Sequence, residues 1–323
     1  MLYPLTLHPV FKERVWGGRN LERLYQKPLP PRVPIGESWE ISDRPGDVSV
    51  IANGPLAGKD LHWLMRNHAA ELLGFVEPRP ARFPLLVKIL DAREKLSLQV
   101  HPPVAQAEKL GGEPKTEMWY IADAAPEAEL YAGLAQGVTR ATFEQNLRAG
   151  TVAGCFHRLS VQPGDALFLP SGRVHAIGAG LVIFEIQQNS DTTYRVFDWN
   201  RVGLDGKPRE LHVAESLACI DFNDFEPQLA PRGVVASGPL KTRRLVADPL
   251  FTVDVLRAET REFMGFSPGK LKIIAIVDGQ LTVTDGKNSV ERGSGQFCLI
   301  PAGIKADMWV EPGSTFLLVQ TGE

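Results

Sequence analysis

Residues 164–175 read GDALFLPSGRVH, and residues 295–306 read GQFCLIPAGIKA. Each stretch places a glycine, a five-residue gap filled largely by apolar residues, a Pro-x-Gly turn and two further residues before its last position. That position is His175 in the first stretch and Ala306 in the second. Short apolar runs between turn residues are typical of β-strands. The repeat predicts a duplicated jelly roll in which the first barrel can hold a metal and the second cannot.

The rest of the chain fits a mainly β protein with a few helices. Short apolar segments broken by glycine and proline indicate strands in a sandwich or barrel. Helices are predicted at 60–73, 139–149 and 211–219 from their apolar spacing and flanking cap residues. Strands are predicted at Leu85–Leu90, Lys95–His101, Glu117–Ala122, Ala166–Leu169, Leu181–Gln187, Leu271–Val277, Leu281–Val283 and Thr315–Gln320.

A domain boundary is predicted near residues 226–240. There the motifs Glu226-Pro227, Pro231-Arg232-Gly233 and Gly238-Pro239 interrupt the pattern of strands. We therefore expect a metal-binding domain over 1–235 and a second, degenerate domain without metal ligands over 236–323.

Charge and composition exclude several classes of protein. The 323 residues include 35 Lys and Arg against 38 Asp and Glu, a net charge of −3. No general attraction to nucleic acid or anionic membranes follows from that balance, so an anionic substrate needs a local cluster of bases. The three cysteines are too few and too widely spaced for a disulfide framework. With no signal peptide or membrane span apparent, we expect a cytoplasmic protein.

The segment Leu96–His101 reads LSLQVH and alternates in polarity. In a strand, alternate side chains share a face, so Ser97, Gln99 and His101 are predicted on one face. Leu96 and the other apolar residues are predicted on the opposite face. A polar face between apolar flanks favours the interior of a barrel, where its side chains gather around a ligand.

Two further stretches complete a possible metal site. Lys115 and Glu117 are two residues apart and share a face, as an ion pair or as part of a site. His175 follows the Pro-x-Gly turn and can project into the barrel. With Gln99 and His101, this set offers two imidazole nitrogens and two oxygens, which zinc accepts, and Mn²⁺ is not excluded by ligand type.

Several motifs, in one order along the chain, resemble type I mannose-6-phosphate isomerases of the short bacterial form. The clearest are FPLLVKIL at 83–90, LSLQVHP at 96–102, KTEMWY at 115–120, PSGRVHAIG at 170–178 and EIQQNSDTTYR at 185–195. WGG at 16–18 and IGESWE at 35–40 look like that family's opening. One departure is Pro114, where many short forms have glycine. The C-terminal third matches only in its general character as a second cupin barrel.

The resemblance implies a cupin fold and one zinc ion per chain. It implies that Gln99, His101, Glu117 and His175 bind the ion. It also implies an active-site arginine at Arg195 and active-site lysines at Lys88 and Lys115.

The chemistry implied by this family is the interconversion of mannose 6-phosphate and fructose 6-phosphate. A proton moves between C1 and C2 through a cis-enediol, whose developing negative charge needs a Lewis acid or cations. Arg195 and Lys115 are expected to be catalytic, with Arg195 holding the enediolate or the phosphate. Lys88 and Ser97 are expected to bind the substrate. The general base stays open between a metal-bound water, Lys115 and a carboxylate.

Two other functions fit the same residues less well. Two histidines and one carboxylate can form the iron triad of an oxygenase, although Gln99 fills a position that an oxygenase would leave open. A non-catalytic sugar-binding cupin is the third possibility, against which the retention of Lys88, Lys115 and Arg195 argues. For the isomerase we expect a small sugar phosphate as partner, neither nucleic acid nor membrane, and a monomer.

Overall fold

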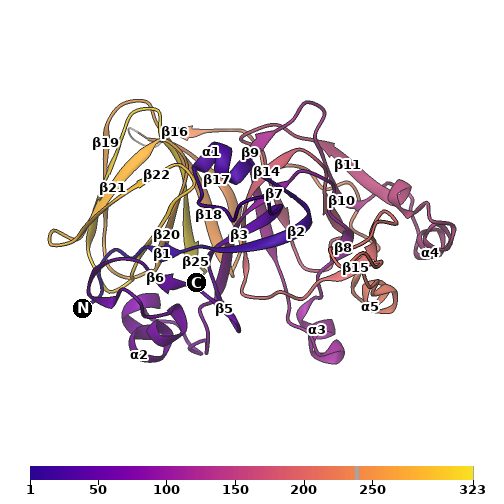
Figure 1. Ribbon diagram of the computed structural model, residues 1–323, viewed down its shortest axis with the longest axis horizontal. Coiled ribbons are helices and arrows are strands. Elements are labelled where there is room, and N and C mark those ends of the chain that lie inside the picture. Colours follow the sequence, from indigo (N-terminus) through magenta and orange to yellow (C-terminus); the bar gives the residue numbers. More distant parts are fainter. Residues whose placement is uncertain (237–239, 323) are drawn as a thin grey trace.

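Two halves of the chain lie side by side, each built from two β-sheets (Figure 1). The computed structural model describes residues 1–236 and 240–322. In the first half, the five-stranded sheet has the order β11-β10-β13-β8-β15, with bounds Phe156–Ser160, Glu129–Leu134, His175–Ile177, Leu98–Val100 and Tyr194–Phe197. The six-stranded sheet has the order β12-β9-β14-β7-β3-β2, with bounds Ala166–Leu169, Glu117–Ala124, Leu181–Gln188, Leu85–Ala92, Ile35–Ile41 and Val10–Gly18. Short pairs join β1 (Leu7–His8) to β6 (Val50–Ile51) and β4 (Asp43–Arg44) to β5 (Asp47–Val48).

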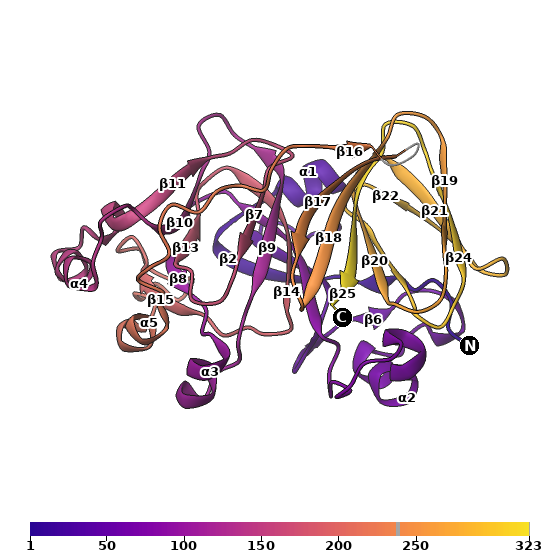
Figure 2. The same ribbon diagram turned by 180° about the vertical axis from the view of Figure 1, so that it is seen from behind.

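The second half repeats this plan, as the view from behind also shows (Figure 2). Its six-stranded sheet has the order β16-β17-β18-β25-β20-β23, with bounds Val235–Ala236, Leu240–Ala247, Phe251–Ala258, Thr315–Thr321, Lys272–Asp278 and Phe297–Ile300. Its four-stranded sheet has the order β19-β24-β21-β22, with bounds Glu262–Phe266, Ala306–Val310, Gln280–Thr284 and Ser289–Gly293.

The six-stranded sheets of the two halves match strand for strand, and the other two sheets differ by β15, which has no counterpart among the described residues. The six-stranded sheet of the first half, read from β12, and that of the second half, read from β23, follow the same order. Each strand therefore has a counterpart at the same place in the other sheet and in the same order along the chain. The repeated sequence motif supplies β12 and β13 in the first half and β23 and β24 in the second. The duplicated, mainly β fold predicted from that motif is confirmed. The domain boundary stays a prediction, and Gly238-Pro239 lie outside the described residues.

Side chains of alternate strand residues fill four apolar clusters. In β7, Leu90 points into the first barrel with Trp119, whereas Ile89 points to the other side and packs in a core shared by both halves. This alternation follows from the pleat of the strand. Phe184 of the first half stacks on Phe297 of the second in the shared core, with ring centres 5.7 Å apart, so the two barrels are joined by buried apolar surface.

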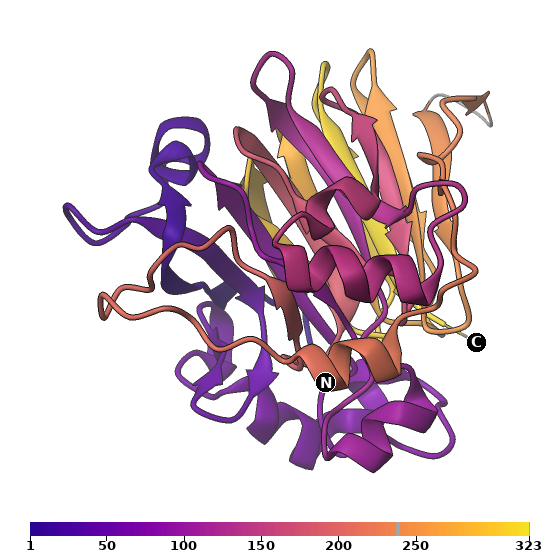
Figure 3. The ribbon, with the colours of Figure 1, turned by 90° about the vertical axis from the view of Figure 1, so that its right-hand side faces the viewer.

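The helices lie around the barrels. α4 and α5 cover the outer face of the five-stranded sheet (Figure 3), and the 3₁₀ turns occur between elements. α2 begins after Asp60, whose side chain accepts from the Trp63 amide at 2.6 Å. Within the described residues, no helix is long and apolar enough to span a bilayer. The bounds are Asn20–Tyr25 for α1, Leu61–Leu73 for α2, Val104–Leu110 for α3, Arg140–Ala149 for α4, Val213–Cys219 for α5, Gly54–Leu56 for η1 and Val152–Cys155 for η2.

The predicted elements differ from the structure in a few places. β8 covers only Leu98–Val100, so the strand predicted over Lys95–His101 is too long. Because the backbone before Leu98 is not in the strand, Leu96 packs inside the first barrel rather than on the outer face with Leu98. α1 and α3 were not predicted, and neither were several strands, among them β2, β3, β10, β17 and β18. The three cysteines are free and buried.

Candidate active site

A row of three side chains crosses the inner face of the five-stranded sheet. In the antiparallel register, His175 of β13 pairs with Gln99 of β8, and Gln99 pairs with Arg195 of β15. Residues directly opposite each other on neighbouring strands point to the same face. Two predicted metal ligands, His175 and Gln99, and the predicted active-site arginine, Arg195, therefore lie side by side across one wall of the barrel.

Glu117 comes from the facing sheet and closes the site. It begins β9, opposite Leu169 of β12, and its side chain is fully buried. Its Oε2 lies 3.4 Å from Nε2 of His101, and its Oε1 lies 3.4 Å from Nε2 of His175. One ligand atom from each of these three residues lies within 4.8 Å of the others. The structure thus brings together three of the four predicted ligands in a group able to hold a metal.

Both histidine rings are oriented by the backbone. Nδ1 of His101 donates to the carbonyl of Thr192 at 2.9 Å, and Nδ1 of His175 donates to the carbonyl of Arg173 at 2.9 Å. Since a carbonyl only accepts, the proton of each neutral ring is on Nδ1 and the lone pair of Nε2 faces Glu117. Burial and the charge of Lys115 lower the pKa of His101 to about 4, and burial lowers the pKa of His175. Both rings are therefore neutral at pH 7, as metal ligands must be.

Glu117 is charged in spite of its burial. Burial by itself raises the pKa of this carboxyl, but the charge of Lys115 outweighs it and holds the pKa well below its usual range. Nζ of Lys115 lies 2.7 Å from Oε2 of Glu117 and donates to Nε2 of His101 at 3.0 Å. The predicted proximity of Lys115 and Glu117 is confirmed.

The Gln99 amide also reaches the ligand group. Its nitrogen lies 3.3 Å from Nε2 of His175, and its oxygen accepts from Oγ of Ser97 at 3.3 Å. Rotating the amide by 180° exchanges these two atoms, and the side chain occupies almost the same space. Gln99 can therefore present its oxygen to an ion held by the other three residues.

Lys88 lies deeper in the barrel, between two carboxylates. Its Nζ is 3.4 Å from Oε2 of Glu37 and 3.3 Å from Oε1 of Glu185, and it sits 5.0 Å from the Trp39 ring centre. Burial lowers the pKa of Lys88, but Glu37 and Glu185 outweigh it and raise the pKa above the usual range. Lys88 is therefore a fully charged group held between two carboxylates.

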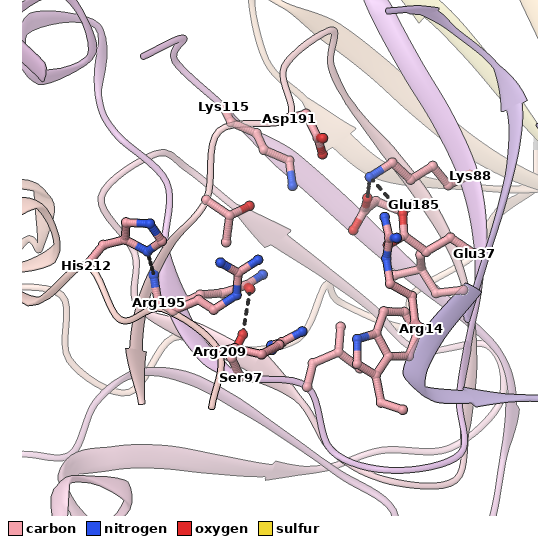
Figure 4. A pocket seen from close by; sticks show the side chains of 15 residues that line it. Arg14, Glu37, Lys88, Ser97, Lys115, Glu185, Asp191, Arg195, Arg209 and His212 are labelled. Atoms are coloured by element: carbon pink, nitrogen blue, oxygen red, sulfur yellow. Dashed lines mark hydrogen bonds and ion pairs between the residues drawn. The ribbon is translucent and has the colours of Figure 1, made fainter. Parts of the chain in front are cut away.

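A cavity of about 420 Å³, large enough for a small metabolite, lies beside these groups (Figure 4). The predicted residues Lys88, Ser97, Gln99, Lys115 and Arg195 all line it. Residues that sequence reasoning missed line it as well: Arg14, Trp16, Glu37, Glu185, Asp191, Arg209 and His212. The motifs that contain Trp16, Glu37 and Glu185 were recognised, but the sequence contains no signal that singles out Arg14, Arg209 or His212.

Comparisons with known proteins agree with this geometry. Residues 5–146 match the family model described as "Phosphomannose isomerase type I, catalytic domain". Mannose-6-phosphate isomerase of Streptococcus mutans is 35% identical over 307 residues, covering 95% of each chain. Mannose-6-phosphate isomerase ManA of Bacillus subtilis is 34% identical over 317 residues, covering 93% of this chain and 94% of its own.

Solved structures give the same result. The crystal structure of mannose 6-phosphate isomerase from Bacillus subtilis superimposes with a TM-score of 0.89 at 31% identity, covering 98% of this chain and 99% of its own. The apo form of the Salmonella typhimurium enzyme has a TM-score of 0.75 at 17% identity and full coverage of both chains, a likeness of fold alone. With its relatives matched over nearly their whole length, the chain belongs to the type I phosphomannose isomerase family.

Proposed function

We propose that this chain interconverts mannose 6-phosphate and fructose 6-phosphate by moving a proton between C1 and C2 through a cis-enediol, with one zinc ion per chain. The observation that carries the proposal is the buried group of His101, Glu117 and His175. It contacts Gln99 and Lys115, which line a cavity that three arginines also line. The comparisons support an isomerase, and they do not support the oxygenase or the non-catalytic cupin.

The residues of the site fit a divalent metal ion. Both oxygens of Glu117 are buried and accept no hydrogen bond of good geometry among the described residues. A buried, charged carboxylate in this condition facing two imidazole lone pairs is the donor set of a metal site. His101, Glu117 and His175 would hold the ion, with Gln99 as a fourth ligand. A bound zinc ion supplies a Lewis acid that polarises the sugar oxygens.

The chain's own side chains supply charge and hydrogen bonds around the reacting carbons. Arg195 presents its planar fork to anionic oxygens of the substrate, next to Gln99 in the row across the sheet. Lys115, beside the ligand group, is placed to hold or move a proton. Lys88 and the hydroxyl of Ser97 bind sugar oxygens from opposite sides of the cavity. The general base is among the groups that surround C1 and C2.

We also propose that the protein is a cytoplasmic monomer that does not bind nucleic acid. The near-neutral charge supports the last point, because nothing in the composition attracts a polyanion in general. Sedimentation of the purified chain tests the assembly, and a multimer would contradict it.

A coupled assay for fructose 6-phosphate formed from mannose 6-phosphate tests the activity, together with metal analysis of the pure protein. Turnover by protein that carries about one zinc ion per chain is the expected result. A metal-loaded protein that does not act on mannose 6-phosphate, or one that consumes oxygen with iron bound, would contradict the proposal.

A further inference from the structure

Three arginines from distant parts of the chain line the same cavity. Arg14 comes from β2, an edge strand of the six-stranded sheet, Arg195 from β15, an edge strand of the five-stranded sheet, and Arg209 from the segment between β15 and α5. We call these three residues the arginine cluster. We infer that the cluster binds the phosphate group of the substrate, with Arg14 and Arg209 contacting it beside Arg195. The inference rests on the proposed function.

Arg195 is the centre of the cluster and lacks a carboxylate partner. Among the described residues, no acidic oxygen lies within ion-pair distance of its guanidinium, and its buried Nε has no hydrogen-bond partner. Burial, and then the charges of Arg209 and Arg14, lower the pKa of Arg195. A guanidinium close to two others and without an anion is a ready site for an anionic ligand.

Arg14 and Arg209 are each held in place from behind. Nε of Arg14 donates to Oε1 of Glu37 at 2.6 Å. Arg209 donates to both oxygens of Asp198, from Nε at 2.7 Å and from Nη2 at 3.1 Å. Each guanidinium keeps further N–H groups that are not used in these bonds. Because the two heads are fixed before the ligand arrives, little entropy is lost when they bind it.

The balance of charge favours this end of the cavity over the lysine end. Arg201 also donates to Asp198, at 2.7 Å, so Arg195, Arg201 and Arg209 face one carboxylate and leave two positive charges in excess. Lys88, in contrast, is paired with Glu37 and Glu185, and Glu37 also holds Arg14. With Asp191, three carboxylates face these two cations and leave one negative charge in excess. A phosphate dianion is attracted to the first group and repelled by the carboxylates of the second. The sugar carbons then extend toward the ligand group.

The test compares Arg14→Gln and Arg209→Gln with Arg140→Gln, a matched change on the exposed face of α4. Glu37 keeps its bonds to Lys88 and Trp39 without Arg14, and Asp198 keeps Arg201 without Arg209, so both variants should fold. Melting curves check this. Losing a charged hydrogen bond costs about 1.5–3 kcal/mol, so KM for mannose 6-phosphate should rise roughly 10- to 100-fold with kcat nearly unchanged.

Binding of inorganic phosphate to the metal-loaded protein, measured by calorimetry, separates this inference from the proposed function. Its Kd should rise by a similar factor in both variants and stay at the wild-type value in Arg140→Gln, whether or not the protein turns over sugar. Arg14→Lys should recover part of the affinity, because it restores the charge but not the fork. Unchanged phosphate affinity and unchanged KM in both glutamine variants would overturn the inference.

Discussion

The two barrels have the same strand order but opposite interiors. In the register of each sheet, the position of His175 corresponds to Ala306, and that of Gln99 corresponds to Phe266. Glu117, opposite Leu169, corresponds to Lys272, opposite Ile300. Three of the four proposed ligands are thus replaced by residues that cannot bind a cation. The comparison teaches that the fold sets the positions and the side chains decide whether a site exists.

The second barrel is sealed where the first is open. Phe266 and Ala306 pack in its apolar core, and the Lys272 ammonium donates to the carbonyls of Ser267 and Lys270 at 3.3 and 2.9 Å. In the first barrel, Lys88, Glu37 and Glu185 line a cavity and Glu117 is buried. Buried charges are costly unless they are paired, and in the first barrel lysines and carboxylates pair with one another, whereas Lys272 in the second is held by backbone carbonyls.

His175→Ala gives the first barrel the residue of the second and should have the largest effect. Loss of a ligand should remove the metal and lower kcat/KM by roughly a thousandfold or more, because a Lewis acid stabilises the transition state by several kcal/mol. Steady-state kinetics and metal content measure this. A variant that keeps its zinc and its turnover would show that the histidine is not what distinguishes the barrels.

Glu37→Gln removes one of the buried charges that the second barrel lacks. Burial opposes ionisation of Glu37, but Lys88, Arg14 and Trp39 outweigh it and lower the pKa to about 2. A shift of about 2.5 units from 4.5 corresponds to about 3 kcal/mol. Because the folded pKa is the lower one, this stability is complete above about pH 4.5 and is lost as the pH falls toward 2.

Urea unfolding of wild type and Glu37→Gln at pH 7 and pH 3 checks that expectation. The difference in unfolding free energy should be large at pH 7 and smaller at pH 3. A difference that does not depend on pH would mean that Glu37 stabilises the barrel by packing, not by charge.

Zinc should stabilise only the first barrel. At a free metal concentration 100 times its Kd, binding adds about 2.7 kcal/mol to the unfolding free energy, so the melting temperature should rise by a few degrees. Chelator should reverse the rise, and His175→Ala should not show it. Scanning calorimetry with and without zinc measures both, and an equal response of the variant would place the metal elsewhere.

Ala306→His restores the missing histidine to the second barrel and should have the smallest effect. Phe266 and Lys272 remain, so we expect no second metal ion in metal analysis. The larger side chain in a packed core should lower the unfolding free energy by about 1–3 kcal/mol. A second zinc ion per chain would show that a single ligand is enough to reopen the site.

Much of the fold was predictable because residues close in the sequence mark where its strands and helices begin and end. The strand at 166–169 was predicted correctly, since a glycine with positive φ precedes it and Pro170 follows it. The helix at 61–73 was nearly so, because Asp60 caps its start and Gly74 its end. α3 was missed because only seven residues separate Pro103 from Gly111, too few to show a periodic pattern.

The candidate site was predictable only where motifs mark it. His101, Glu117 and His175 were expected to converge, and they do. Arg14 could not be found, because its approach to Arg195 depends on how the edge strands β2 and β15 face each other across the barrel. Arg209 could not be found, because it lies on an irregular segment between β15 and α5. The periodicity of residues within one segment does not reveal how close that segment lies to another part of the chain.

The beginning of the chain also contributes to the second barrel. Leu5 exchanges backbone hydrogen bonds with Leu299 at 2.9 and 2.8 Å. At the end of α2, Leu72 and Glu71 accept from the amides of Ala302 and Gly303. During synthesis these early segments stay without their partners until the last strands have left the ribosome. The first half therefore gains its full set of contacts only when translation is almost complete, because the second barrel supplies the partners of Leu5 and of the end of α2.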